Sequence, residues 1–101
     1  MLIVNTTYQV SEDCQSDWIL WVKNEYIPEV TKTNLMTHPR FFRLMVENEP
    51  GNASYALQFE VKDLDTLEYW FQQYGTNMQQ VMSNRFQEKV LGFTTMMETV
   101  E

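Results

Sequence analysis

The chain has 101 residues, of which 44 % are hydrophobic and 14 % aromatic. A chain of this length removes about two-thirds of its unfolded surface from water, so residues 1–101 are expected to form one domain with one core. Fourteen acidic residues against seven basic ones give a net charge of −7. This charge opposes contacts with phosphate groups and argues against nucleic acid or an anionic membrane as a partner.

Cysteine and histidine are too scarce for a metal or disulfide framework. Cys14 is the sole cysteine and His38 the sole histidine, so neither an intrachain disulfide nor a paired zinc-ligand spacing can be assembled. The first ten residues lack the basic leader and cleavage site of a signal peptide, and no apolar run reaches the length of a membrane span. We therefore predict a cytoplasmic protein with no metal and no tightly bound cofactor.

The first third of the chain predicts a strand followed by a helix. Residues 2–10 are rich in β-branched and aromatic residues, which favours a strand. After a polar break, apolar residues recur at the spacing of one helical stripe: Cys14, Trp18, Trp21, Val22 and Tyr26. Pro28 is expected to end or kink this helix near Ile27, because it has no N–H to donate and its ring crowds the preceding turn.

Two strands with a tight turn are predicted next. Residues 40–49 and 53–62 read as a hairpin, and Pro50-Gly51 suits the central positions of a type II turn. The return strand alternates cleanly, with its core positions at Tyr55, Leu57, Phe59 and Val61. On the outgoing strand, the expected core positions are Phe42, Leu44 and Val46.

The remaining segment predicts a long helix and a final strand. Asp63 can cap the helix by accepting the free N–H groups of its first turn. The expected apolar stripe is Leu67, Trp70, Phe71, Tyr74, Met78, Val81, Met82 and Phe86. Gly75-Thr76-Asn77 is expected to bend or divide the helix, and residues 90–100 return as a strand.

The predicted order, βαββαβ, is that of an α+β ferredoxin-like fold. Such a chain closes as a four-stranded antiparallel sheet with both helices on one face. The other face would carry Phe41, Arg43 and Met45, a set that is too apolar for open water and too polar for a dry core. This predicts a homodimer in which two sheets meet and Arg43 pairs with a carboxylate such as Glu47 or Glu60. A monomer whose long polar side chains cover these apolar residues is the alternative.

The whole chain resembles a small bacterial group of uncharacterised proteins in the dimeric α+β barrel superfamily. The resemblance rests on "WILWVKNEYIPEV" at 18–30, the "FFRLMVE" strand and the ending "RFQEKVLGFTTMME". The most specific element is the helix end, where the matching residues are Trp18, Trp21, Lys23, Ile27, Pro28 and Val30. Tyr26 stands where the group has histidine. The resemblance implies a dimeric barrel in which a polar residue near this helix end faces a pocket between helix and sheet.

The candidate functional residues are few. Tyr26 could orient a ligand by hydrogen bonding, although with an ordinary pKa of about 10 it is a poor base, and its alternative role is packing. His38 could serve as a general base but reads equally as a connector residue beside Pro39. Trp18 and Trp70 could line an aromatic pocket or simply form the core. Asn5 could reach the pocket floor or the dimer partner.

The sequence is compatible with two functions. The leading hypothesis is a homodimer of the dimeric α+β barrel type that binds a small apolar ligand, and whose activity is unassigned. The alternative is a cofactor-independent enzyme, similar to the monooxygenases or isomerases of the superfamily, that acts on a small aromatic substrate. In that case Tyr26 and His38 are the candidate catalytic residues.

Overall fold

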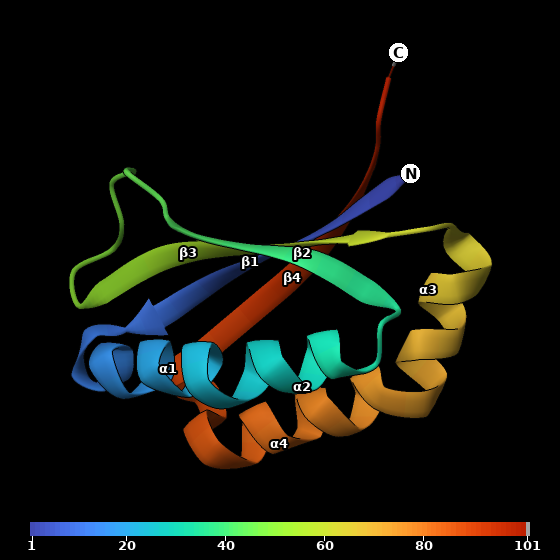
Figure 1. The fold of residues 1–101 in the computed structure, drawn as a ribbon. Helices are drawn as coiled ribbons and strands as arrows, with labels where there is room; N and C mark the ends of the chain where they lie inside the picture. Colours follow the sequence, from blue (N-terminus) through green and yellow to red (C-terminus); the bar gives the residue numbers. More distant parts are fainter. Residues whose placement is uncertain (101) are drawn as a thin grey trace.

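The computed structural model describes residues 1–100 and contains one antiparallel sheet of four strands (Figure 1). The strands are β1 (Leu2–Ser11), β2 (Met36–Arg43), β3 (Asn52–Val61) and β4 (Val90–Glu98). Their order across the sheet is β2-β3-β1-β4, which places β2 and β4 at the two edges. This is the ferredoxin-like sheet that the sequence predicts.

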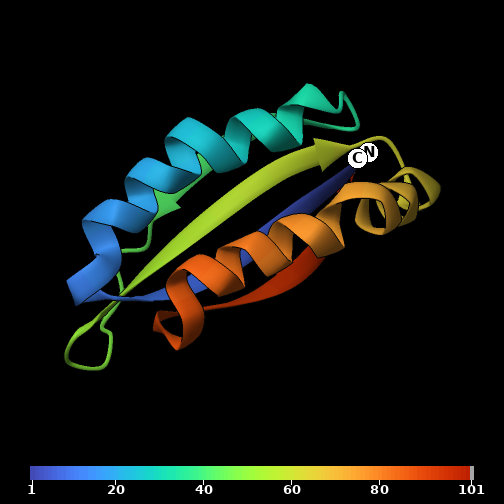
Figure 2. The ribbon, with the colours of Figure 1, turned by 90° about the horizontal axis from the view of Figure 1, so that it is seen from below.

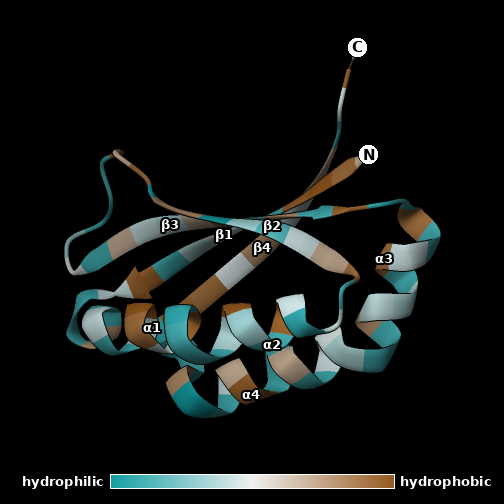
Figure 3. Cartoon of the chain, in the orientation of Figure 1, coloured by the Kyte–Doolittle hydropathy of each residue, from teal (hydrophilic) through white to brown (hydrophobic). Residues whose placement is uncertain are grey.

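Two long helices cover one face of the sheet and run alongside each other (Figures 1 and 2). Each consists of two α-helical segments joined by a π turn. The segments are α1 (Gln15–Trp21), η2 (Val22–Tyr26) and α2 (Ile27–Lys32), and then α3 (Leu64–Trp70), η3 (Phe71–Gly75) and α4 (Thr76–Phe86). Each helix has both hydrophobic and hydrophilic residues (Figure 3), as expected for helices with one face on the core.

The core lies between the helices and the sheet. Trp18 is fully buried and contacts the rings of Tyr8, Phe41 and Tyr55, with centroid distances of 5.1, 5.6 and 5.3 Å. The predicted core positions of the third strand, Tyr55, Leu57, Phe59 and Val61, are all buried. Aromatic rings therefore supply much of the apolar area that folding removes from water.

Pro28 does not end the first helix. The helix continues through η2 to Lys32, with Pro28 in the first turn of α2. In η2 the N–H of Ile27 donates to the carbonyl of Val22, five residues back. A proline fits the start of a helical segment because its missing N–H is not needed there, and the wide turn supplies such a start inside a continuous helix.

The second π turn shifts the apolar stripe of the second helix. Leu67, Trp70, Met82 and Phe86 are buried as predicted, and Met78 is half-buried. Phe71, Tyr74 and Val81 are exposed instead. The five-residue turn at η3 adds one residue to the helical repeat, and this rotates the later positions relative to a stripe of constant 3.6-residue period. The predicted division of this helix near Gly75 is confirmed.

The second strand differs from its prediction in both bounds and faces. It begins at Met36 and ends at Arg43, so Leu44 and Val46 lie beyond it. Thr37 pairs with Glu60 but Arg40 pairs with Gln58, so β2 holds one extra residue at this bulge. His38 has a positive φ of 52° there. One extra residue reverses which side chains face the core, so Phe41 packs against the core and Phe42 is exposed.

The predicted type II turn is confirmed. Gly51 has a φ of 88°, and the N–H of Asn52 donates to the carbonyl of Glu49 at 3.1 Å. Pro50 fixes the first central position and Gly51 accepts the positive φ of the second.

Asp63 caps the second helix as predicted. Its Oδ1 accepts hydrogen bonds from the backbone N–H of Thr66 at 2.8 Å and from the Thr66 hydroxyl at 2.6 Å. These bonds favour the ionised carboxylate and lower its pKa.

The lowered pKa of Asp63 predicts a dependence of stability on pH. The stabilising contribution should be fully present above the unfolded-state pKa, which is about 3.9, and should be lost as the pH falls through the folded-state pKa. Asp63→Asn keeps a capping side chain without the ionisation, so its unfolding free energy should fall less steeply on acidification. Urea denaturation of both proteins between about pH 2 and 6 measures the two slopes, and equal slopes would contradict the assignment.

Candidate functional site

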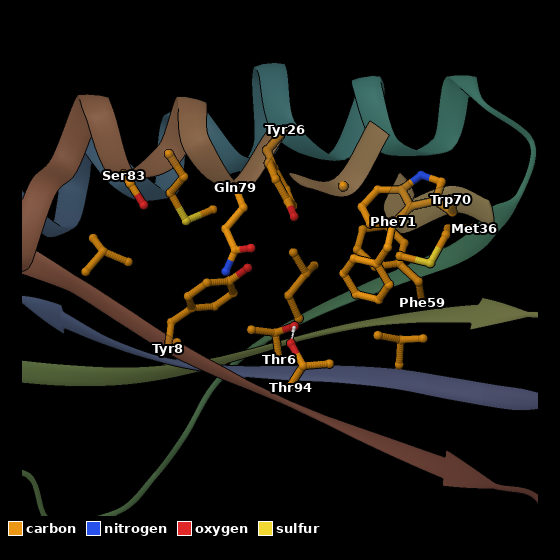
Figure 4. Close-up of a pocket in the computed structure, with 16 residues that line it drawn as sticks. Thr6, Tyr8, Tyr26, Met36, Phe59, Trp70, Phe71, Gln79, Ser83 and Thr94 are labelled. Atoms are coloured by element: carbon orange, nitrogen blue, oxygen red, sulfur yellow. Dashed lines mark hydrogen bonds between the residues drawn. The ribbon is translucent and has the colours of Figure 1, made fainter. Parts of the chain in front are cut away.

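A partly enclosed cavity of about 120 Å³ lies between the sheet and the helices (Figure 4). Its floor comes from β1, β3 and β4 with Met36 of β2, and its roof comes from the first π turn and the second helix. The largely apolar part of its wall consists of Val4, Met36, Leu57, Phe59, Trp70, Phe71, Met82 and Val90. A pocket with such walls suits an organic molecule better than a hydrated ion.

Both π turns border this cavity. Tyr26 is the last residue of η2, and Phe71 and Gly75 begin and end η3; all three line the cavity. A π turn is a rare departure from the α-helix and frequently marks a functional site. Gly75 is buried, and a Cβ added to it would lie 2.5 Å from Trp70 and 2.7 Å from Phe71. The absence of a side chain at Gly75 thus allows these two rings to pack against the helix backbone.

Tyr8 and Tyr26 bring hydroxyl groups to the cavity from opposite sides, the sheet and the helix (Figure 4). Burial raises the pKa of Tyr8 well above its ordinary value, and the nearby Tyr26 hydroxyl raises it further. Burial also raises the pKa of Tyr26, although its interaction with Tyr8 lowers it in part. Both phenols therefore keep their protons near neutral pH and can donate hydrogen bonds. Neither is a base.

Gly92 on β4 makes room for Tyr8. The two residues are partners across the β1–β4 pairing, and a Cβ on Gly92 would lie 2.8 Å from Cδ1 of the Tyr8 ring. The ring therefore lies against the bare backbone of β4. Gly92 fixes the position of the Tyr8 hydroxyl through this close approach.

The mouth of the cavity is polar and uncharged. Five lining residues are exposed. Gln79 and Ser83 on α4 and Gly92 and Thr94 on β4 show that the cavity opens between these two elements, and Phe71 is exposed at the start of η3. The hydroxyls of Thr6 and Thr94 lie 3.0 Å apart. Among residues 1–100, the lining includes no carboxylate, histidine, lysine or arginine. The arrangement can bind and orient a ligand but offers it no ionised acid–base pair.

The structure brings two of the predicted site residues to the cavity and separates the others. Tyr26 and Trp70 line it. Trp18 belongs to the aromatic core instead. Asn5 lies on the opposite face of the sheet, where its side chain donates to Thr7 and accepts from Gln58. His38 lies in the β2 bulge, 3.7 Å from a carboxylate oxygen of Glu60, and not in a connector between helix and strand.

The face of the sheet away from the helices, which we call the open face, carries exposed apolar side chains. They are Phe42 on β2 and Leu91, Phe93 and Met97 on β4. The predicted interface set is placed differently. Phe41 packs against the core, Arg43 pairs with the core residue Tyr55, and Met45 lies in the loop after β2. The prediction that Phe41 and Arg43 share the open face is wrong because of the bulge in β2.

Several lining residues were not foreseen from the sequence. The alternation of the first strand indicates that Tyr8 and Thr6 face inward, but it does not indicate a cavity there. Gly92 and Thr94 lie in a final strand that is mostly apolar, so nothing in the sequence singles them out. Gly75 inside a helix was the one available signal, since an interior glycine usually has a packing reason.

Residues 1–100 contain neither a cluster of metal ligands nor a membrane-spanning helix. This part of the chain holds no group of three His, Cys, Asp or Glu side chains placed to bind a metal. No helix within it has the length and apolar character needed to cross a membrane.

Several solved structures share this fold at low sequence identity. HapK from Hahella chejuensis is 12 % identical with a TM-score of 0.73, and the match covers 99 % of this chain and 93 % of that one. A dimeric ferredoxin-like protein from an uncultured marine organism is 18 % identical with a TM-score of 0.68, covering 99 % and 95 %. An antibiotic biosynthesis monooxygenase is 17 % identical with a TM-score of 0.65, covering all of both chains. At these identities the likeness establishes the fold alone.

No curated protein matches the sequence. Residues 1–100 do match one protein family. That family is described as a domain of unknown function, DUF4286. The match spans the sheet, both helices and every residue that lines the cavity. The chain therefore belongs to the DUF4286 family and has the ferredoxin-like fold.

Proposed function

We propose that this protein is a cytoplasmic homodimer that binds a small, mostly apolar molecule of about one ring in the cavity beneath the two π turns. The observation that carries the proposal is the cavity itself, with aromatic walls and with the hydroxyls of Tyr8 and Tyr26 inside. Its volume of about 120 Å³ is close to that of an engineered apolar cavity in another protein, roughly 150 Å³, which binds benzene. A six-membered ring is therefore the appropriate size.

The composition of the lining favours binding over catalysis. The enzyme alternative needs a group that accepts a proton, and the raised pKa values of Tyr8 and Tyr26 make both phenols poor acceptors. His38 lies on β2 and does not line the cavity. A molecule of six or seven heavy atoms that gains mainly from burial is expected to bind with a Kd on the order of 0.1–1 mM.

The open face supports the homodimer. Leu91 and Phe93 are 61 % and 67 % exposed, and apolar side chains grouped on one face usually mark an interface. On the same face Arg40 lies over the ring of Phe42 at 5.1 Å, and Glu60 supplies a carboxylate. Apolar side chains with both signs of charge make a surface that a second copy can complement. A structural neighbour is described as dimeric, and the lone Cys14 suits a reducing compartment.

Toluene tests the binding site directly. In a ¹H–¹⁵N spectrum, added toluene should shift the amide signals of Gly75 and Gly92, which line the cavity, and leave that of Gly51 unchanged because it lies in the distant β2–β3 turn. Ser83→Leu places a branched side chain at the mouth and should weaken toluene binding at least about tenfold, since it occupies the space that the ring needs.

Gln80→Leu is the matched control, because Gln80 is exposed on the same helix and does not line the cavity. It should bind toluene as the unaltered protein does. A titration in which toluene shifts neither cavity glycine, or in which Ser83→Leu binds as tightly as Gln80→Leu, would contradict the proposal.

A further inference from the structure

The polar groups inside the cavity offer more hydrogen-bond donors than they can use among themselves. The hydroxyls of Thr6 and Thr94 lie 3.0 Å apart and share one hydrogen bond. Two hydroxyls that share one bond keep one O–H between them, because only one proton lies in the bond. The hydroxyls of Tyr8 and Tyr26 also face the cavity, and both keep their protons near neutral pH. The cavity therefore has O–H groups that can donate to a ligand.

Trp70 contributes an aromatic wall to the cavity and not a donor. It is 2 % exposed and lines the cavity, and within residues 1–100 its Nε1 has no hydrogen-bond partner. In Figure 4 this nitrogen lies on the side of the ring away from Tyr8, Tyr26 and Thr6. The donors inside the site are therefore the hydroxyls, and an acceptor oxygen on the ligand would engage one of them.

The electrostatics of the site favour an uncharged ligand. Every lining residue is neutral. The Lys32–Glu29 and Lys89–Asp13 ion pairs and the contact between His38 and Glu60 all involve residues outside the cavity. An anion or cation that enters loses its hydration and finds no opposite charge, which is strongly unfavourable in an apolar site. The chain's net charge of −7 disfavours anions further.

We infer that the cavity binds a neutral carbonyl compound of about one ring, such as a cyclic ketone, with its oxygen toward the Tyr26 hydroxyl and its hydrocarbon ring against Trp70 and Phe71. This inference rests on the proposed function, since it names the class of molecule that the same cavity takes. Tyr26 is the donor of choice because it ends η2 and points its hydroxyl from the helix toward the sheet, into the space between them (Figure 4). A carbonyl oxygen can accept two hydrogen bonds there and brings no donor of its own.

Cyclohexanone and methylenecyclohexane test the inference as a pair, because they differ only in a C=O or C=CH₂ group on the same ring. Binding is followed through the amides of Gly75 and Gly92 in the full chain. Tyr26→Phe removes one hydroxyl and keeps the ring, so it should weaken cyclohexanone binding about fivefold and leave methylenecyclohexane binding unchanged. Tyr69→Phe, at an exposed position on α3, is the control and should change neither affinity. Cyclohexanecarboxylate, the anionic probe, should bind more weakly than cyclohexanone at neutral pH.

The outcomes distinguish a failure of this inference from a failure of the proposed function. If Tyr26→Phe changes the affinities for cyclohexanone and methylenecyclohexane by the same factor, the carbonyl assignment is overturned and ring binding stands. Tighter binding of cyclohexanecarboxylate than of cyclohexanone overturns the choice of a neutral ligand. If neither ring shifts Gly75 or Gly92, both the inference and the proposed function fail.

Discussion

Replacing Trp18 with alanine is expected to lower the free energy of unfolding by about 3–5 kcal/mol. The indole is fully buried and touches the rings of Tyr8, Phe41 and Tyr55. Alanine would leave a cavity that three aromatic neighbours from three strands cannot fill. Urea denaturation followed by circular dichroism measures the change. Tyr69→Ala, at a half-exposed position on α3, should lower the free energy of unfolding by well under half as much as Trp18→Ala does.

Trp18→Phe separates the core role of this residue from a role in the ligand site. This substitution retains a ring and removes an indole N–H that, within residues 1–100, has no hydrogen-bond partner. It should therefore lower the free energy of unfolding less than Trp18→Ala does. Toluene binding should persist, because Trp18 does not line the cavity. If the Trp18→Phe protein is folded but no longer binds toluene, Trp18 contributes to the ligand site and the prediction is wrong.

Phe93→Glu is expected to weaken the homodimer at least about a hundredfold. Phe93 lies on the open face, opposite Thr7 in the β1–β4 pairing, and is 67 % exposed in the single chain. In a two-fold dimer the substitution buries a carboxylate twice, once from each copy, without a matching cation. Sedimentation equilibrium across micromolar concentrations compares the dissociation constants.

Leu20→Glu controls for the added charge. Leu20 is 57 % exposed but lies on α1, on the helix side of the molecule. It should leave the dissociation constant within about threefold of that of the unaltered protein, because surface changes away from an interface have small effects. A monomeric unaltered protein at these concentrations, or equal effects of the two substitutions, would show that the open face is not the interface.

Local sequence signals were sufficient to predict the order of elements and the fold. The β-branched run at 2–10, the Pro50-Gly51 turn and the Asp63 cap each have a local physical cause, and the structure contains all three. The alternation in 53–62 was also unambiguous, because one set of side chains is large and apolar and the other is small or polar. These features agree with one another, which is why the fold follows from them.

The faces of β2 could not be predicted in the same way. Phe41 and Phe42 are equally apolar neighbours, so the pattern gives no preference for either. The choice depends on one extra residue at the bulge near His38 and Pro39, where proline has no N–H for the ladder. A bulge of this kind changes every later assignment on the strand by one residue, and this accounts for Phe41 and Arg43. Met45 was misplaced for another reason, because β2 ends at Arg43.

The candidate site was predictable only in part. Tyr26 was identified through its place at the end of the helical stripe and through the resemblance at that position, and it lines the cavity. The π turns were not foreseen, since they differ from the α-helix by one residue per turn and have weak sequence signals. Tyr8, Gly75 and Gly92 matter through close approaches between elements distant in the chain, and a single sequence does not report such approaches.

The crystal structure of the protein grown with bromobenzene tests the central claim most directly. The account predicts an anomalous bromine peak inside the cavity, with the ring between Trp70, Phe71 and Tyr26 and beneath the two π turns. Bromobenzene found only on the open face or between the outer surfaces of the helices, with the cavity unoccupied, would contradict it.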